Sequence, residues 1–268
     1  MVICPNCGKE NGTSFRFCMG CGGAMPKRTS PPLALAPSAA STEPLTWTRT
    51  AKPPTRSHLE LTALAIDGTM TGVHPLPEGP SVFGRNLGGP FTADVFLSRS
   101  HGSFTPRGDR LLVRDEASLN GIYRRLQPKE SAPLSSGQCF RVGQQLLRFE
   151  ALATKPPDAD NVAWLGASSE NILGRVVLVH GRETSGNAAI VPKSGLQIGR
   201  EEGAILFPDD PYVSGKHCRL NVEGDQIVLV DLESSNGTFV RLIAETEVGP
   251  GEQLLLGKLL FRVGLAAI

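Results

Sequence analysis

The sequence is poor in aromatic residues and carries almost no net charge. Aromatic residues make up only 6% of its 268 residues, whereas it contains 30 glycines and 21 prolines. This turn-rich composition favours short strands over long helices. The net charge of +1 excludes a chain that as a whole attracts nucleic acid or membranes by its charge.

Long apolar segments are also missing. The apolar run at residues 254–268 is interrupted by Lys258 and Arg262, and no stretch approaches the roughly 18 uncharged apolar residues of a spanning helix. The N-terminus has no basic segment followed by an apolar one, which is the pattern of a secretory signal. We therefore expect a soluble, cytoplasmic protein.

Cysteines give the first strong signal. Four of the six form two CxxC pairs within the first 21 residues, and Cys139 and Cys218 stand alone as expected core residues. Two CxxC pairs supply the four thiolates of a closed tetrahedral zinc site, which has no open position for catalysis. So short a segment has almost no core, so the metal must supply most of its folding free energy. The predicted structural zinc ligands are Cys4, Cys7, Cys18 and Cys21.

Other uses of the paired cysteines remain open beside zinc. A redox dithiol would normally lie in a βαβ unit, which the neighbouring sequence lacks. Disulfides need an oxidising compartment, and iron also accepts four thiolates, although zinc is the usual occupant. Residues 1–23 resemble the short zinc ribbons found at the start of many bacterial regulatory proteins.

Residues 24–56 are rich in Pro, Ser, Thr and Ala and show no sustained apolar period. This composition predicts a disordered linker with some polyproline character. A kinase would find several accessible threonines there, namely Thr29, Thr42, Thr46, Thr48, Thr50 and Thr55.

The rest of the chain contains an internal repeat. Four sequence blocks recur in the same order at an offset of 114 to 116 residues, which predicts two homologous domains. We call residues 57–151 the first repeat and residues 171–268 the second repeat, with a second linker at 152–170. The blocks pair Phe83-Gly84-Arg85 with Ile198-Gly199-Arg200, Ser98-Arg99-Ser100-His101 with Ser214-Gly215-Lys216-His217, residues 115–121 with 231–237, and 140–149 with 254–263.

Both repeats read as strands. Short runs rich in branched residues, bounded by glycine-containing turns, occur at residues 59–65, 110–114, 175–180 and 226–231. Many short strands with regular turns indicate an antiparallel sandwich, and no capped amphipathic helix is recognisable. The predicted fold class is all-β.

Each repeat carries Gly-Arg, then Ser-x-x-His beginning 13 or 14 residues after the arginine, then Asn-Gly. This ordered set, present twice over nearly 200 residues, resembles the forkhead-associated (FHA) domain. The resemblance implies two tandem β-sandwiches, each with loops at one end that bind phosphothreonine peptides and catalyse nothing. A guanidinium group suits such a ligand because it forms two parallel hydrogen bonds with phosphate oxygens.

The resemblance assigns roles in the first repeat residue by residue. Arg85 would bind the phosphate, Ser98 would donate its hydroxyl to a second phosphate oxygen, and Arg99 would add positive charge. Asn120 would hold the main chain of the ligand through its amide. The residues expected to shape these loops from inside are Gly84, His101 and Gly121.

The second repeat departs from the first at two positions. Gly215 stands where the first repeat has Arg99, with Lys216 next to it, and Ser235 stands where the first repeat has Leu119. Each repeat thus lacks one polar contact that the other has, and we expect at least one of them to bind phosphate. Carried over with these changes, the set comprises the binding residues Arg200, Ser214, Lys216, Ser235 and Asn236 and the structural residues Gly199, His217 and Gly237.

These observations predict a non-catalytic phosphothreonine-binding adaptor in Ser/Thr kinase signalling, whose partners are phosphorylated proteins, including kinases or their substrates. A phosphorylated linker threonine is expected to dock at Arg85 and Ser98 and exclude other ligands. One alternative is an interaction scaffold that has lost its phosphate dependence. A less favoured one is nucleic-acid binding through the zinc ribbon, because residues 1–57 carry a net charge of only +5, or +3 with zinc bound by four thiolates.

Overall fold

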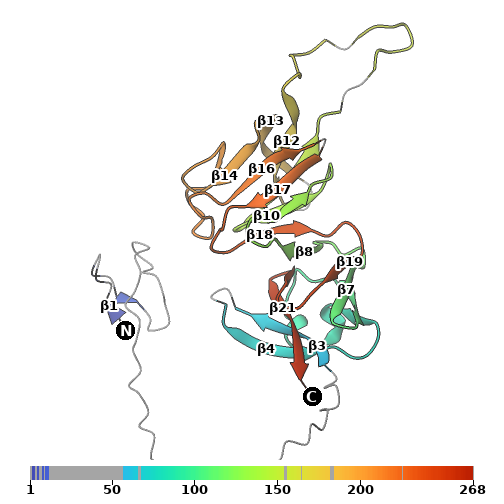
Figure 1. Cartoon of the computed structure of the whole chain (residues 1–268), viewed down its shortest axis with the longest axis vertical. Helices are drawn as coiled ribbons and strands as arrows, with labels where there is room; N and C mark the ends of the chain where they lie inside the picture. Colours follow the sequence, from blue (N-terminus) through green and yellow to red (C-terminus); the bar gives the residue numbers. More distant parts are fainter. Residues whose placement is uncertain are drawn as a thin grey trace, which may run out of the picture. The chain divides into compact units, whose positions relative to one another are not determined.

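The computed structural model describes residues 2–3, 5, 8, 10–11, 57–65, 68–153, 156–163, 165–181, 184–224 and 226–267. The chain divides into two compact units, Met1–Ala51 and Lys52–Ile268. In the first unit, β1 (Val2–Ile3) pairs antiparallel with β2 (Glu10–Asn11) (Figure 1). The predicted linker at 24–56 and the four predicted zinc ligands, Cys4, Cys7, Cys18 and Cys21, lie outside the described residues.

The regular elements described in the second unit are strands and two 3-10 helices of three residues each. The strands predicted at 59–65, 110–114, 175–180 and 226–231 are confirmed, and so is the all-β fold class. No helix among the described residues is long and apolar enough to cross a membrane. In chain order the elements are β3 (Ser57–Leu64), β4 (Met70–Pro75), β5 (Ser81–Phe83), η1 (Arg85–Leu87), η2 (Gly89–Phe91), β6 (Gly102–Arg107), β7 (Arg110–Asp115), β8 (Ile122–Arg125), β9 (Ser131–Pro133), β10 (Cys139–Val142), β11 (Gln145–Ala151), β12 (Ile172–His180), β13 (Thr184–Pro192), β14 (Leu196–Gly199), β15 (Ile205–Leu206), β16 (Cys218–Glu223), β17 (Gln226–Asp231), β18 (Thr238–Arg241), β19 (Thr246–Val248), β20 (Gln253–Leu256) and β21 (Leu259–Ala267).

Three sheets form two lobes. The ten-stranded sheet has the order β13-β12-β11-β10-β18-β8-β20-β21-β3-β4 and passes from one lobe to the other between β18 and β8. The first lobe contains β3–β8 and β19–β21, and its second layer is the four-stranded sheet β19-β7-β6-β5. The second lobe contains β9–β18, and its second layer is the five-stranded sheet β15-β14-β16-β17-β9.

Each lobe combines strands from both sequence repeats. In the first lobe, β21 and β19 of the second repeat pair with β3 and β7 of the first repeat. In the second lobe, β11 and β9 of the first repeat pair with β12 and β17 of the second. Figure 1 shows this exchange by colour, since red β19 and β21 lie among blue and teal strands, whereas green β10 lies among orange ones.

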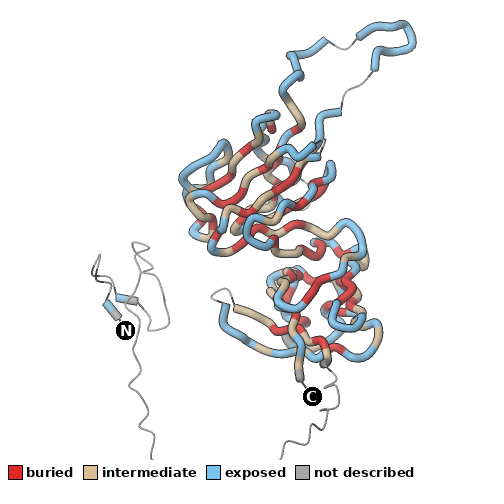
Figure 2. The backbone as a smooth tube through the Cα atoms, viewed as in Figure 1, coloured by how far each residue is buried: buried red, intermediate tan, exposed pale blue. Residues whose placement is uncertain are grey.

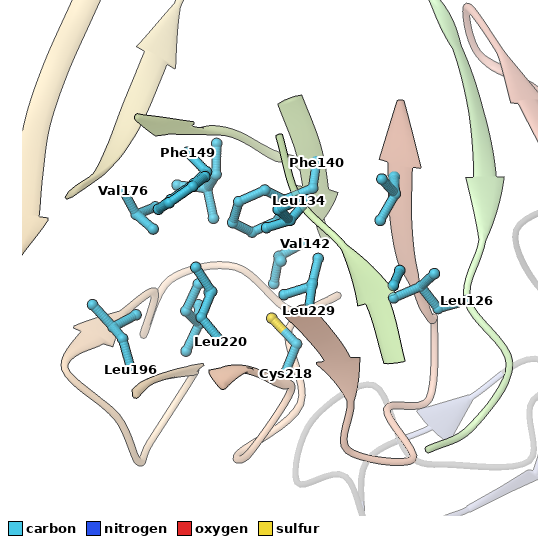
Figure 3. Packing of buried hydrophobic residues seen from close by; sticks show 14 of the residues in the cluster. Leu126, Leu134, Phe140, Val142, Phe149, Val176, Leu196, Cys218, Leu220 and Leu229 are labelled. Carbon is cyan, nitrogen blue, oxygen red and sulfur yellow. The ribbon is translucent and has the colours of Figure 1, made fainter. Parts of the chain in front are cut away.

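The two hydrophobic cores follow the same exchange. In the first lobe, Phe91 of the first repeat stacks on Phe261 of the second, with ring centroids 5.9 Å apart. In the second lobe, Phe140 and Phe149 of the first repeat share a core with Leu220 of the second (Figure 3). Truncating a buried Phe to Ala costs about 3–5 kcal/mol, so each lobe depends on both repeats. Neither predicted domain range, 57–151 or 171–268, holds a complete core by itself.

The crossing points are β8 and β18, which pair antiparallel with Val240 opposite Arg124. Ile122 at the start of β8 lies in the first core, and Leu126 just beyond its end lies in the second. The backbone N–H of Leu126 donates to the carbonyl of Thr238 at 2.8 Å. Arg124 adds an ion pair with Glu252 at 3.1 Å. The repeats are thus joined by hydrogen bonds and charge as well as by apolar packing.

The segment between β11 and β12 contributes little to this packing. Its described residues at 156–163 and 165–170 are all exposed, whereas buried residues gather within the two lobes (Figure 2). The residues that complete each lobe are therefore the exchanged strands and not the connection between the repeats.

Candidate functional site

The Gly84-Arg85 segment lies against the Ser98-Arg99 loop in the first lobe. The backbone N–H of Arg85 donates to the carbonyl of Ser98 at 3.1 Å, and that of Asn86 donates to the carbonyl of Arg99 at 3.2 Å. A Cβ atom at Gly84 would collide with the carbonyl oxygen of Arg99, so only glycine permits this approach. The two loops therefore present Arg85 and Ser98 side by side.

The asparagine turn is tied to the same loops. The backbone N–H of Leu119 donates to Ser98 Oγ at 3.1 Å, and Asn120 Nδ2 donates to the carbonyl of Phe96 at 2.7 Å. A serine hydroxyl that accepts this bond still has its own hydrogen to donate. The side chains of Arg85 and Asn120 are exposed, and Ser98 is half-buried. We call Arg85, Ser98, Arg99 and Asn120 the first rim.

His101 supports the first rim from inside and is fully buried. Its Nδ1 accepts the backbone N–H of Ser98 at 3.0 Å, and its Nε2 lies 3.0 Å from the carbonyl oxygen of Gly121. The ring is therefore neutral, with its hydrogen on Nε2, and burial lowers the pKa of His101. Gly121 has a φ of 80°, a left-handed conformation that favours glycine.

The second lobe repeats this network. Ser214 Oγ accepts the backbone N–H of Ser235 at 3.1 Å, and Asn236 Nδ2 donates to the carbonyl of Tyr212 at 2.9 Å. The buried His217 accepts the backbone N–H of Ser214 at 3.0 Å, and burial lowers its pKa as well. At Gly199 a Cβ atom would collide with the carbonyl oxygen of Gly215, and Gly237 has a φ of 83°. The second rim comprises Arg200, Ser214, Lys216, Ser235 and Asn236.

The cations of the two rims differ in their partners. Arg200 Nη2 lies 2.9 Å from Glu201 Oε1, and Lys216 Nζ lies 3.1 Å from Glu202 Oε2. Within the described part of the chain, the guanidinium groups of Arg85 and Arg99 make neither an ion pair nor a hydrogen bond. Both rims thus have the same backbone frame, but the cations of the second rim are already paired with carboxylates.

The sequence repeat also contains two supporting arginines that the motif analysis missed. Arg241 of the second repeat lies against Gly121 and has its Nη2 3.7 Å from Asp115 Oδ2. Arg125 of the first repeat lies against Gly237 and donates to the carbonyl of Ser235 at 3.4 Å. Each rim is therefore supported by an arginine from the other repeat. Their offset of 116 residues equals that of the asparagines and was the available signal.

The remaining described cysteines have no site around them. Cys218 is fully buried in the second core, and burial raises the pKa of its thiol. Cys139 is half-buried, and burial raises its pKa too. Both are free thiols, and the described residues contain no group of three or more potential metal ligands.

Comparison with known families supports two parts of the chain. The FHA domain matches residues 196–257, and the zinc-ribbon domain matches residues 3–25. The FHA match lies within the second repeat, so it identifies one such domain in the sequence. Because it runs from β14 to β20, it spans strands of both lobes.

A solved structure described as "Structural and functional analysis of phosphothreonine-dependent FHA domain interactions" is 27% identical. The match covers 31% of this chain and 88% of that chain. Its TM-score is only 0.20, so the match carries no argument about the fold.

Several bacterial relatives match about a third of the chain. The oxoglutarate dehydrogenase inhibitor of Corynebacterium jeikeium is 34% identical over 31% of this chain and 73% of its own length. The glycogen accumulation regulator GarA of Mycolicibacterium smegmatis is 31% identical over 32% of this chain and 69% of its own. The FHA domain-containing protein FhaB of Mycobacterium tuberculosis is 28% identical over 35% and 63%. The chain therefore belongs to the family of FHA-domain proteins.

Proposed function

We propose that this protein is a non-catalytic adaptor that binds phosphothreonine-containing segments of other proteins in Ser/Thr kinase signalling. The observation that carries the proposal is the hydrogen-bond network found in both rims. In each rim a serine hydroxyl accepts a backbone N–H and keeps its own hydrogen, next to an arginine and an asparagine. A phosphothreonine offers up to two negative charges and three acceptor oxygens to such a set.

The proposal treats the first repeat as a second FHA domain, so that the chain contains two. Its support is the identical order of bonds at Ser98, His101 and Asn120 and at their counterparts Ser214, His217 and Asn236. The two sandwiches are composite, since strands β9–β11 and β19–β21 are exchanged between the repeats.

The zinc ribbon is proposed to hold one structural Zn²⁺ through Cys4, Cys7, Cys18 and Cys21. Four cysteines in two CxxC pairs fit that ion, because thiolates are its preferred ligands in closed sites. Strands β1 and β2, which pair Ile3 with Glu10, lie on either side of the first CxxC pair in the sequence. Gly8, just after that pair, has a left-handed φ of 71°.

The decisive experiment is calorimetric titration of the full chain with a phosphothreonine peptide library and its unphosphorylated counterparts. We expect binding that requires phosphate, weakened at least tenfold at the altered rim in Arg85→Ala or Arg200→Ala, since a charged hydrogen bond contributes about 1.5–3 kcal/mol. Arg107→Ala is the matched control, because Arg107 is exposed and lies outside both rims. Equal binding of the unphosphorylated peptides would contradict the proposal.

Phospho-independent binding is the second candidate, and one observation favours it at the second rim. Glu201 and Glu202 already pair with Arg200 and Lys216, so the cations there are less available to a phosphate. The titration separates the two candidates. Phospho-independent binding is supported if the Arg85→Ala variant still binds a partner, and binds it equally well with and without phosphate.

We also propose that a phosphorylated threonine of the linker docks in the first rim. The linker precedes that lobe directly in sequence, so tethering raises its effective concentration into the mM range, roughly. Phosphorylation of the linker is expected to weaken peptide binding at Arg85. An unchanged affinity after stoichiometric phosphorylation would show that no such docking occurs.

A further inference from the structure

The two rims open onto adjoining cavities. Asn120 lines a cavity of about 210 Å³, and Asn236 lines one of about 590 Å³. Every residue around the smaller cavity has its repeat counterpart around the larger one, as Tyr123 has Phe239. The cavities therefore occupy equivalent places beside the two asparagines.

Three residues line both cavities, namely Arg141, Gly257 and Lys258. Arg141 lies on β10 opposite Phe239 of β18, next to the seam between the lobes. Gly257 and Lys258 form the turn between β20 and β21. The exchange of strands thus places one arginine in the wall of both cavities.

Arg141 is the unsatisfied group at this place. Its Nε is buried and has no hydrogen-bond partner, and within the described ranges its guanidinium makes no ion pair. A buried donor without a partner is unfavourable, and a carboxylate is the group that satisfies a guanidinium best. Two carboxylates beside the cavity-lining turns already accept backbone hydrogen bonds. Asp94 accepts the backbone N–H of Lys258 at 2.7 Å, and Asp210 accepts that of Gln144 at 2.8 Å.

The two cations that line both cavities, Arg141 and Lys258, have no charged counterparts in the other repeat. The repeat counterpart of Arg141 is Leu255, and that of Lys258 is Gln144. Lys258 is also held in position, since its Nζ lies 4.9 Å from the centroid of the Phe96 ring. Both cations therefore lie beside Asn120, the residue expected to hold the main chain of a ligand.

We propose that Arg141 is a shared binding site for an acidic side chain of the bound phosphopeptide, used by ligands of the first rim and of the second. The inference rests on the proposed phosphothreonine binding. A peptide held by Asn120 or Asn236 passes directly beside a cavity in whose wall Arg141 lies. Both rims consequently select phosphopeptides with Asp or Glu near the phosphothreonine, and two such peptides compete for one guanidinium.

The test uses the full chain and two probes, a phosphothreonine peptide flanked by aspartates and the same peptide with asparagines. The Arg200→Ala variant reports on the first rim and the Arg85→Ala variant on the second. We expect each to prefer the aspartate peptide at least tenfold. Adding Arg141→Gln should abolish the preference at both rims, so that the aspartate and asparagine peptides bind with equal affinity. Arg262→Gln, at an exposed position of β21, is the matched control.

Several results would overturn the inference. A preference that survives Arg141→Gln, or one lost at a single rim, shows that Arg141 is not a shared site. If Arg141→Gln does not fold, Arg141→Lys keeps the charge but cannot form two parallel bonds, and a preference equal to that of the parent protein again refutes the inference. Failure of every phosphothreonine peptide to bind overturns the proposed function too, whereas phosphate-dependent binding without acidic preference overturns only the shared site.

Discussion

The two rims share one backbone frame but differ in charge. Each holds a serine, an asparagine and a buried histidine in the same hydrogen-bond network. The first rim presents Arg85 and Arg99, for which the described residues offer no counter-ion, whereas in the second rim Arg200 and Lys216 bind Glu201 and Glu202. Loop geometry is thus set by glycines, histidine and turns, while exposed neighbours decide whether the cations of a rim are already paired.

The difference implies an order of affinity between the rims. A phosphate that enters the second rim must displace a carboxylate from Arg200 and meets the charge of Glu201. Exposed ion pairs contribute only about 0.2–1 kcal/mol. The pairing of Arg200 with Glu201 should therefore lower the affinity of the second rim for phosphate without abolishing binding. We therefore expect the first rim to be the tighter of the two.

The strongest prediction separates the repeats physically. A protease site placed within residues 156–163, which are exposed, allows the chain to be cut between the repeats. Because both cores contain residues of both repeats, the two fragments should stay together on size-exclusion chromatography and part only in denaturant. Fragments that elute separately in native buffer would contradict the exchange and make the rims independent.

A second prediction asks whether the two buried histidines behave alike. Burial lowers the pKa of His101 and of His217, so as the pH falls below about 6.5, the ordinary pKa of a histidine, the unfolded chain binds protons that the folded chain does not. Above about pH 6.5 the two histidines do not reduce the free energy of unfolding. As the pH falls below about 6.5, each histidine should lower the free energy of unfolding by up to about 1.4 kcal/mol per pH unit.

Urea denaturation at closely spaced pH values measures this slope. His101→Asn and His217→Asn should each remove about half of it, since the two networks match. A slope that neither variant changes would show that other groups govern the pH dependence. A slope removed by one variant alone would mean that the lobes are not equivalent.

The third prediction crosses the repeats. Arg241 lies against Gly121 of the first rim, and Arg125 lies against Gly237 of the second. Arg241→Ala removes an ion pair with Asp115 and should weaken phosphopeptide binding at the first rim. Arg125→Ala removes a hydrogen bond to the carbonyl of Ser235 and should weaken binding at the second rim. Each effect should be up to a few-fold, because such contacts contribute about 0.2–1.5 kcal/mol. Titrations in the Arg200→Ala and Arg85→Ala backgrounds assign the effect. The opposite assignment would mean that each arginine supports the rim of its own repeat.

The smallest expected effect concerns the carboxylate beside each arginine. Asn86 is the counterpart of Glu201 in the first repeat. Glu201→Asn should tighten phosphopeptide binding at the second rim, and Asn86→Glu should weaken it at the first, each by up to about fivefold. High salt should reduce both effects, because exposed charges are screened. Unchanged affinities would show that the carboxylates do not govern the difference between the rims.

Much of the fold was predictable because the repeat and the strand pattern can be read directly from the order of residues along the chain. Alternating branched residues gave the strands at 59–65 and 226–231, and the ordered blocks gave the family resemblance. The rim residues came from the resemblance to the FHA domain, and in the structure bonds between neighbouring loops hold Arg85, Ser98 and Asn120 close together. The roles of Arg125 and Arg241 were missed although their offset of 116 residues was a signal, because an arginine on a strand is usually just an exposed charge.

The sequence alone determined the number of repeats, the strand-rich composition and the side chains of each rim, because period, turn chemistry and motif order are written along the chain. Tertiary structure decided which half of a repeat completes which lobe. The strands that follow β8 and β18 are homologous, so each fits either partner, and pattern cannot choose between them. Only the packing shows that Phe261 joins Phe91 and that Arg141 comes to lie beside both asparagines.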